Sequence, residues 1–199
     1  NPLWRTSLER LFYINAFITH NNLTNNVHFD NDVLIYKNIE DILTILNDNI
    51  PNIGLTPHKE GELVCGFMFL KKKNSLEVLC HELLNLAKLG EYKLEEMLQS
   101  MPNEMRLLGH LQSNILNKDH ITSLPVSPLD PGNNMYELFN GVFDPRDVNR
   151  FIDRHIVANK FTPIFDSNNY HPYIQLDGRH IPIFNLHIHN KRLDEYSIR

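Results

Sequence analysis

The chain has 199 residues, of which 42% are hydrophobic and 22% charged, and its formal net charge at pH 7 is −5. This composition predicts one globular domain over residues 1–199, and the lack of a basic excess argues against a nucleic-acid partner. No apolar run approaches the roughly 18 residues that span a bilayer, so we expect no transmembrane segment in this chain and a cytoplasmic location. The two cysteines form no C-x-x-C pair and predict two buried, reduced thiols.

The N-terminal part of the chain predicts a helix, a loop and an interrupted strand. Apolar residues recur with helical period over residues 4–16, and asparagines mark a loop at 21–26. The segment 27–36 is typical of a strand with a polar interruption at 30–32. Asn38 can then cap a further helix, whose apolar positions extend to residue 46.

The next segment contains the longest apolar run. Pro51, Gly54 and Pro57 predict a loop, and a turn at Gly61 leads into a buried strand over 63–70. A leucine-rich helix follows over residues 76–86, with Asn74 or Ser75 as its cap and Gly90 as its stop.

The C-terminal half predicts shorter elements. Two helical stretches are expected near 92–100 and 103–112, and a proline-rich loop covers 124–134. A short helix is expected at 145–154 and a last strand at 181–189. Strands separated by helices predict an α/β fold with a mixed sheet flanked by helices.

The first candidate for chemistry is Asp30-Asn31-Asp32. In an extended segment, residues i and i+2 point to the same side, so both carboxylates could hold a hard cation such as Mg²⁺ or Mn²⁺. The alternative is an Asx-type turn at a strand end. Apolar residues directly behind the pair favour the cation, because burying two carboxylates there is costly without one.

The second candidate is the C-terminal strand. His187, His189 and Lys191 alternate with apolar residues and share one face, where imidazole suits Mn²⁺ and ammonium suits a phosphate oxygen. The alternative is a half-exposed edge strand with a solvated polar face.

At three further positions the structural explanation is at least as strong as the functional one. Glu104 follows Asn103 at a helix start, where the dipole favours a carboxylate, but it could also serve as a general base. Gly66 inside a strand indicates either close approach of a ligand or a bulge. Asp144 before Pro145 is explained by capping of the following helix.

Taken in order, these motifs resemble bacterial-type glycosyltransferases of the type A fold, related to capsule and polysaccharide enzymes. The resemblance covers most of the chain, and its most specific parts are the two strands that carry the acidic pair and the histidines. It is carried by Thr6-x-x-Glu9-Arg10, Val27 to Tyr36, Gly66-Phe67, Asn103-Glu104, Gly141 to Asp144 and Asn185 to Lys191.

The resemblance implies transfer of a sugar from a nucleotide-sugar donor to a glycan or other hydroxyl acceptor. Asp30 and Asp32 would hold Mn²⁺ or Mg²⁺ against the diphosphate, with His187 or His189 completing the metal site. The resemblance further implies that Lys191 steadies the leaving diphosphate and that Glu104 is the catalytic base. Gly66, Phe67 and Asn31 would contact the substrate.

One departure is that nothing before Thr6 can be the nucleotide-gripping strand with which such enzymes begin, so the chain is expected to lack its N-terminal part. Two other classes remain open. One is a metal-dependent hydrolase that uses the H-x-H strand, and the other is a non-catalytic glycan-binding module.

Overall fold

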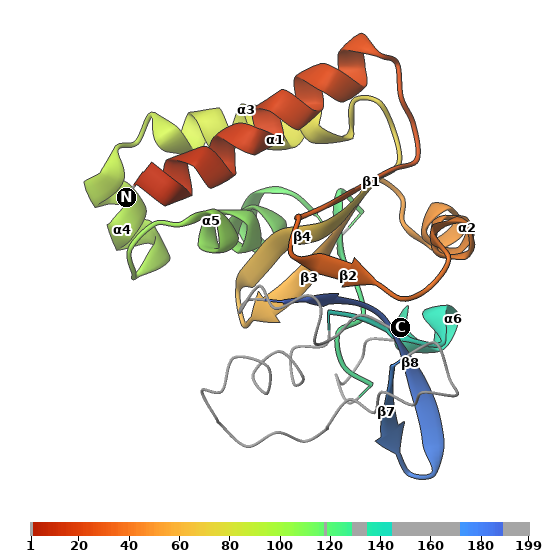
Figure 1. Ribbon diagram of the computed structural model, residues 1–199. Helices are drawn as coiled ribbons and strands as arrows, with labels where there is room; N and C mark the ends of the chain where they lie inside the picture. Colours follow the sequence, from red (N-terminus) through yellow and green to blue (C-terminus); the bar gives the residue numbers. More distant parts are fainter. Residues whose placement is uncertain (1, 118, 129–134, 145–171, 189–199) are drawn as a thin grey trace. The chain divides into compact units, whose positions relative to one another are not determined.

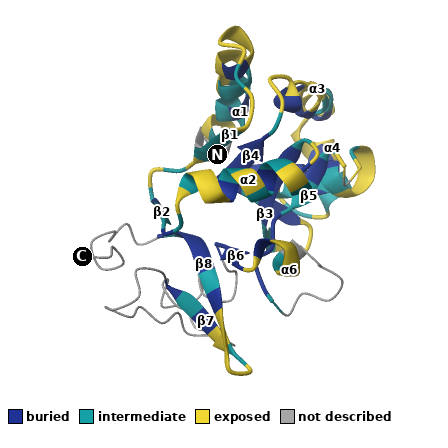
Figure 2. Ribbon diagram, turned by 90° about the vertical axis from the view of Figure 1, so that its right-hand side faces the viewer, coloured by how far each residue is buried: buried dark blue, intermediate teal, exposed yellow. Residues whose placement is uncertain are grey.

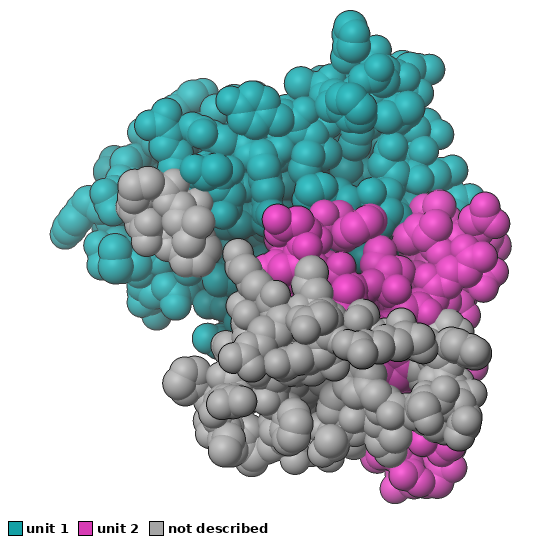
Figure 3. Space-filling view, in the orientation of Figure 1, with its two compact units in different colours: residues 1–28, 47–123 teal, residues 29–46, 124–199 magenta. Residues whose placement is uncertain are grey.

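The computed structural model describes residues 2–117, 119–128, 135–144 and 172–188, and it confirms the α/β class with mixed sheets and helices. The chain divides into two compact units (Figure 3). Unit 1 contains residues 1–28 and 47–123, and unit 2 contains residues 29–46 and 124–199.

Unit 1 is built on a four-stranded mixed sheet with the strand order β1-β4-β3-β5, of which Figure 1 labels β1, β4 and β3. The central strand β3 pairs antiparallel with β4 and parallel with β5. The strands are β1 (Asn26–Phe29), β3 (Ile53–Lys59), β4 (Glu62–Leu70) and β5 (Ile121–Ser123).

Four helices accompany this sheet. Helix α5 packs on β4, and α1 contacts both α3 and α5. Their apolar sides and strands β3 and β4 form the core of the unit, which appears in dark blue in Figure 2. In the part of the chain that the structure describes, no helix combines the length and apolarity that a bilayer crossing needs. The helices are α1 (Pro2–His20), α3 (Ser75–Ala87), α4 (Glu91–Leu98) and α5 (Glu104–His110), which continues into a π-helical turn, Leu111–Ile115.

The predicted loop around Pro51, Gly54 and Pro57 is wrong, because β3 occupies most of it. Proline is excluded from a central strand only where its missing N–H would remove a ladder bond. Strand β5 pairs with β3 only at Ile53, Gly54 and Leu55, so Pro57 lies beyond this pairing. Ile53 and Leu55 are fully buried, which explains why this strand is central despite its composition.

The cysteine prediction is confirmed. Cys65 on β4 and Cys80 on α3 are both buried, and neither forms a disulfide. Burial raises the pKa of the Cys80 thiol to about 11, so at neutral pH the side chain is a neutral apolar group within the core.

Unit 2 has a second mixed sheet, with the order β2-β8-β6 and with β7 paired to β8. Helix α2 begins in this unit as predicted, and Asn38 caps it by accepting a hydrogen bond from the Glu40 N–H at 3.0 Å. The elements are β2 (Val33–Ile35), α2 (Ile39–Asn49), α6 (Met135–Phe139), β6 (Val142–Phe143), β7 (Tyr173–Leu176) and β8 (Arg179–His187).

The predicted last strand is confirmed as β8, but its hairpin partner β7 was not predicted. Asp177 and Gly178 connect the two strands with φ angles of 48° and 76°. Two left-handed residues in a two-residue loop are typical of a type I′ turn, which matches the twist of the strands and favours Asp-Gly. The Asp177-Gly178 dipeptide is the signal in the sequence from which the hairpin could have been predicted.

The predicted strand 27–36 is wrong as a single element. Strand β1 belongs to the sheet of unit 1 and β2 to the sheet of unit 2, and a turn separates them. In this turn the Val33 N–H donates to the Asp30 carbonyl at 3.1 Å. The helix predicted at 145–154 lies outside the described residues.

Candidate metal centre

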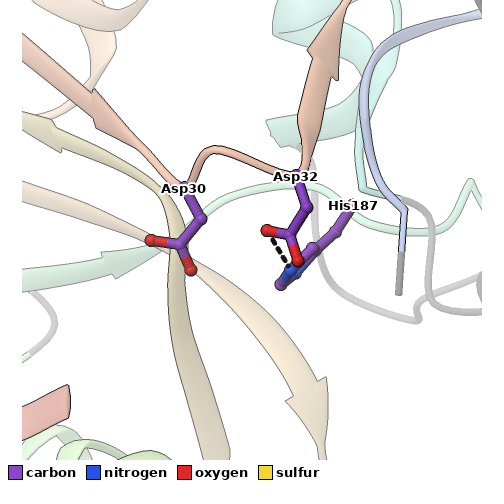
Figure 4. Close-up of side chains that lie close together, drawn as sticks. All are labelled: Asp30, Asp32 and His187. Carbon is purple, nitrogen blue, oxygen red and sulfur yellow. Dashed lines mark ion pairs between the residues drawn. The ribbon is translucent and has the colours of Figure 1, made fainter. Parts of the chain in front are cut away.

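The two aspartates of the D-x-D motif lie on the turn between β1 and β2. The expectation that an extended backbone aligns Asp30 and Asp32 is wrong, because Asn31 and Asp32 are turn residues. The backbone forms a turn here, and the Asx-type hydrogen bond of the alternative stays a prediction. Figure 4 shows the Asp32 carboxylate facing His187 and Asp30 beside them, and the ligand atoms of all three lie within 4.8 Å of one another.

Strand pairing brings His187 to this turn from the far end of the chain. In the antiparallel pair β2–β8, Val33 is the partner of His187, so the residue after Asp32 lies opposite the histidine. The Ile188 N–H also donates to the Asp32 carbonyl at 2.7 Å. These backbone contacts place the His187 Nε2 atom 3.0 Å from the Asp32 Oδ1 atom.

The geometry of the three side chains fits one cation. Their ligand atoms all lie within 4.8 Å of one another. With metal–ligand distances of about 2.1 Å, neighbouring ligands of an octahedral ion lie roughly 3 Å apart and opposite ones roughly 4.2 Å apart. The 3.0 Å between His187 Nε2 and Asp32 Oδ1 matches neighbouring ligands of such an ion, and the Asp30 carboxylate lies within 4.8 Å of both.

The local environment strengthens electrostatic interactions at this cluster. The side chains of His187 and Asp32 are 17% and 16% exposed. Charges that are largely withdrawn from water attract a cation more strongly than fully solvated ones. Two carboxylates and one neutral imidazole carry a net charge of about −2, which a divalent cation would balance.

Asp144 supports the cluster and was not predicted to do so. Its Oδ1 atom accepts a hydrogen bond from the backbone N–H of His187 at 3.0 Å. In sequence, Asp144 precedes a proline and was explained as a helix cap, and nothing in the spacing indicates a bond to a residue so distant.

Glu104 belongs to unit 1, as the first residue of α5. It is buried, and its Oε1 atom lies 2.9 Å from Nη2 of Arg10 on α1. Asn103 caps the helix by accepting from the Arg106 N–H at 3.0 Å. This ion pair supports the structural alternative for Glu104, and the role of general base stays a prediction.

Gly66 and Phe67 lie on β4 in unit 1, at an irregularity of the sheet. Leu55 pairs with Met68, but the next residue of β3, Thr56, pairs with Val64, so the ladder shifts across this glycine. Gly66 therefore lies at an irregularity of the pairing, in agreement with the structural alternative, and the Phe67 side chain is buried. Their predicted contact with substrate stays a prediction.

Of the remaining predicted site residues, one is described by the structure and two are not. Asn31 is exposed on the turn between the two aspartates. His189 and Lys191 lie outside the described residues. The cluster that the structure brings together consists of Asp30, Asp32 and His187.

Comparisons of the chain with protein-family models, with curated proteins and with solved structures found no match. The resemblance to type A glycosyltransferases therefore remains a prediction from the sequence motifs.

Proposed function

We propose that this chain binds a divalent cation through Asp30, Asp32 and His187, and that it uses the site to transfer a sugar from a nucleotide-sugar donor to a hydroxyl acceptor. The observation that carries the proposal is the convergence of the three side chains, whose ligand atoms lie within 4.8 Å of one another. A turn and a strand from distant parts of the sequence supply them.

The chemistry of the ligands supports Mn²⁺ or Mg²⁺. Both ions prefer carboxylate oxygens, and the imidazole favours Mn²⁺, because Mg²⁺ takes almost only oxygen ligands. Three protein ligands leave roughly half of an octahedral shell open to a substrate. When bound, the cation would neutralise the negative charge that builds on the departing nucleoside diphosphate.

The residues of the chain have separate tasks in this proposal. Asp30 and Asp32 supply the negative charge, and the turn between β1 and β2 fixes their spacing. His187 must offer a nitrogen that carries no proton, because only a neutral imidazole binds metal. Lys191 on the diphosphate and Glu104 as base for the acceptor hydroxyl are roles that the sequence resemblance implies.

The experiment is a transfer assay on the full chain. The chain is incubated with a panel of UDP- and GDP-linked sugars, with Mn²⁺ or with EDTA, and with or without mono- and oligosaccharide acceptors. Mass spectrometry then follows the nucleoside diphosphate and the glycosylated acceptor. We expect both products only when Mn²⁺ and an acceptor are present.

Two outcomes would contradict the proposal in different ways. Equal release of nucleoside diphosphate without acceptor would indicate a metal-dependent hydrolase. Glycan binding that is unaffected by EDTA, with no donor consumed, would indicate a binding module. Asp32→Asn should abolish transfer, whereas Asp48→Asn, which removes an exposed carboxylate of α2, should retain it.

A further inference from the structure

Asp144 is joined to β8 by two hydrogen bonds. Its backbone N–H donates to the Asn185 carbonyl at 3.0 Å, and its Oδ1 atom accepts from the His187 N–H at 3.0 Å. One residue thus contacts the backbone of β8 at two positions, and the second position carries the candidate metal ligand.

The side chain of Asp144 forms the next hydrogen bond to β8 after the strand β6 ends. Strand β6 pairs parallel with β8, with Val142 opposite Ile183 and Phe143 opposite Asn185. If β6 continued, a backbone carbonyl would accept from the next free N–H of β8. Because the strand ends at Phe143, the carboxylate of Asp144 accepts that bond in its place.

The conformation of Asp144 is itself unusual. Its φ angle is 37°, in the left-handed region, and the residue is only 7% exposed. Aspartate and asparagine enter this region more readily than other residues that have a Cβ atom, but the conformation still needs support from its surroundings. The two bonds to β8 supply that support and leave the carboxylate buried against the strand.

We propose that Asp144 is a positioning residue for His187, and that it sets the affinity of the chain for a divalent cation without contacting the ion. The proposal rests on the proposed function of the Asp30, Asp32 and His187 cluster. Fixing the N–H of His187 fixes the backbone from which the imidazole extends toward Asp32. Partners that orient a metal ligand in this way influence affinity strongly, because a displaced ligand closes the coordination shell poorly.

The alternative is that Asp144 serves the fold of unit 2 alone. Two substitutions separate these roles. Asp144→Gly removes the carboxylate but tolerates the left-handed backbone without strain, and Asp144→Asn keeps an Oδ1 acceptor in a residue type that also tolerates it. A fold-only role predicts a loss of thermal stability with unchanged metal affinity.

The experiment measures Mn²⁺ affinity of the full chain by calorimetry and, separately, thermal unfolding in EDTA by circular dichroism. We expect Asp144→Gly to weaken Mn²⁺ binding by about 10- to 100-fold while the chain remains folded at the temperature of the titration. Asp144→Asn should stay within about threefold of the unsubstituted chain, because the bond to His187 is retained. Thr56→Val, a buried change in unit 1 that removes the hydrogen bond to the Phe67 carbonyl, should lower stability without altering Mn²⁺ affinity.

Each other result contradicts the proposal. If Asp144→Gly binds Mn²⁺ as the unsubstituted chain does, or if Asp144→Asn is as weak as Asp144→Gly, the bond to His187 does not set the affinity. If Asp144→Gly is unfolded, the residue serves the fold and the proposal is wrong. If the unsubstituted chain does not bind Mn²⁺, the proposed function itself fails, which distinguishes the two.

Discussion

The Nε2 atom of His187 lies 3.0 Å from the Oδ1 atom of Asp32, although the two residues come from nearly opposite ends of the chain. A metal ion at this place would need the Nε2 nitrogen without a proton, because only a neutral imidazole binds metal. The contact therefore holds two of the proposed ligand atoms at the separation of neighbouring ligands around one ion.

The ion pair between Arg10 and Glu104 predicts a structural cost for its removal. Glu104 is 4% exposed, so Glu104→Ala removes a buried counter-charge of the Arg10 guanidinium. We expect a loss of about 3 kcal/mol in the free energy of unfolding, measured by urea denaturation. The lower end of the usual range applies because the Arg10 side chain is 28% exposed.

The matched control for Glu104 is Glu91, which is also an acidic residue in the first turn of a helix but is exposed on α4. Glu91→Ala should cost less than about 1 kcal/mol, because only the helix-dipole interaction is lost. Equal effects of the two substitutions would show that the ion pair contributes nothing, and would leave the general-base role as the main reason for a buried carboxylate at Glu104.

His120 predicts a loss of stability in mild acid. Burial lowers the pKa of His120 from its ordinary value of 6.5; a hydrogen bond with the Ser75 backbone opposes this shift, and the positive charge of Lys72 adds to it. The Ser75 hydroxyl donates to the Oδ1 atom of Asn52, so the Asn52 amide N–H faces the Nδ1 atom of His120 at 3.0 Å. In the tautomer with no proton on Nδ1, this atom accepts the bond, and a proton on Nδ1 would break it.

The sign of the pH effect follows from this lowered pKa. Below about pH 6.5 the unfolded chain takes up a proton at His120 that the folded chain resists, so the free energy of unfolding falls as pH decreases. Above about pH 6.5, His120 is neutral in both the folded and the unfolded chain, and it no longer lowers the free energy of unfolding. In urea denaturation between pH 5 and 7.5, His120→Gln should flatten the profile, whereas His20→Gln, at an exposed position on α1, should not. An unchanged slope in His120→Gln would contradict the assignment.

Local sequence signals predicted the parts of the fold that depend on local chemistry. Helix α2 begins where Asn38 offers a cap, and strand β4 matches its continuous apolar run. The acidic pair and His187 or His189 were candidate ligands because of their spacing beside apolar residues and because of the family resemblance. Asp30, Asp32 and His187 needed no knowledge of the fold because their chemistry is unusual beside apolar strands.

The predictions that were wrong or missing concern structure that depends on contacts between residues distant in sequence. The sequence of β3 resembles a loop because it contains proline. Proline is tolerated in this strand because the neighbouring strand β5 ends before Pro57, and the sequence does not show where β5 ends. The segment from Val27 to Tyr36 looks like one strand, because no local signal shows that its halves join different sheets. The bond between Asp144 and His187 likewise depends on the pairing of β6 with β8.

Asn185 predicts a gain in stability on substitution by an apolar residue. It is fully buried on β8, and neither its Nδ2 nor its Oδ1 atom has a hydrogen-bond partner in the structure as described. A buried polar group without a partner costs about 1–3 kcal/mol. Asn185→Leu keeps the number and branching of the side-chain heavy atoms and should raise the free energy of unfolding by about 1 kcal/mol or more.

The comparison for Asn185→Leu is Asn185→Asp, which places a charge at the same buried position and should be strongly destabilising. Both are measured by urea denaturation in EDTA. A marked loss of stability in Asn185→Leu would mean that the amide has a partner, such as an internal water molecule, and that the prediction is wrong.

The most direct test of the metal site is a calorimetric titration of the chain with Mn²⁺ at pH 7.5. The account predicts one site per chain, and a loss of affinity of at least about 100-fold in Asp32→Asn and in His187→Gln, with Asp48→Asn unchanged. No measurable binding to the unsubstituted chain, or equal binding by all four proteins, would contradict a cation held between Asp30, Asp32 and His187.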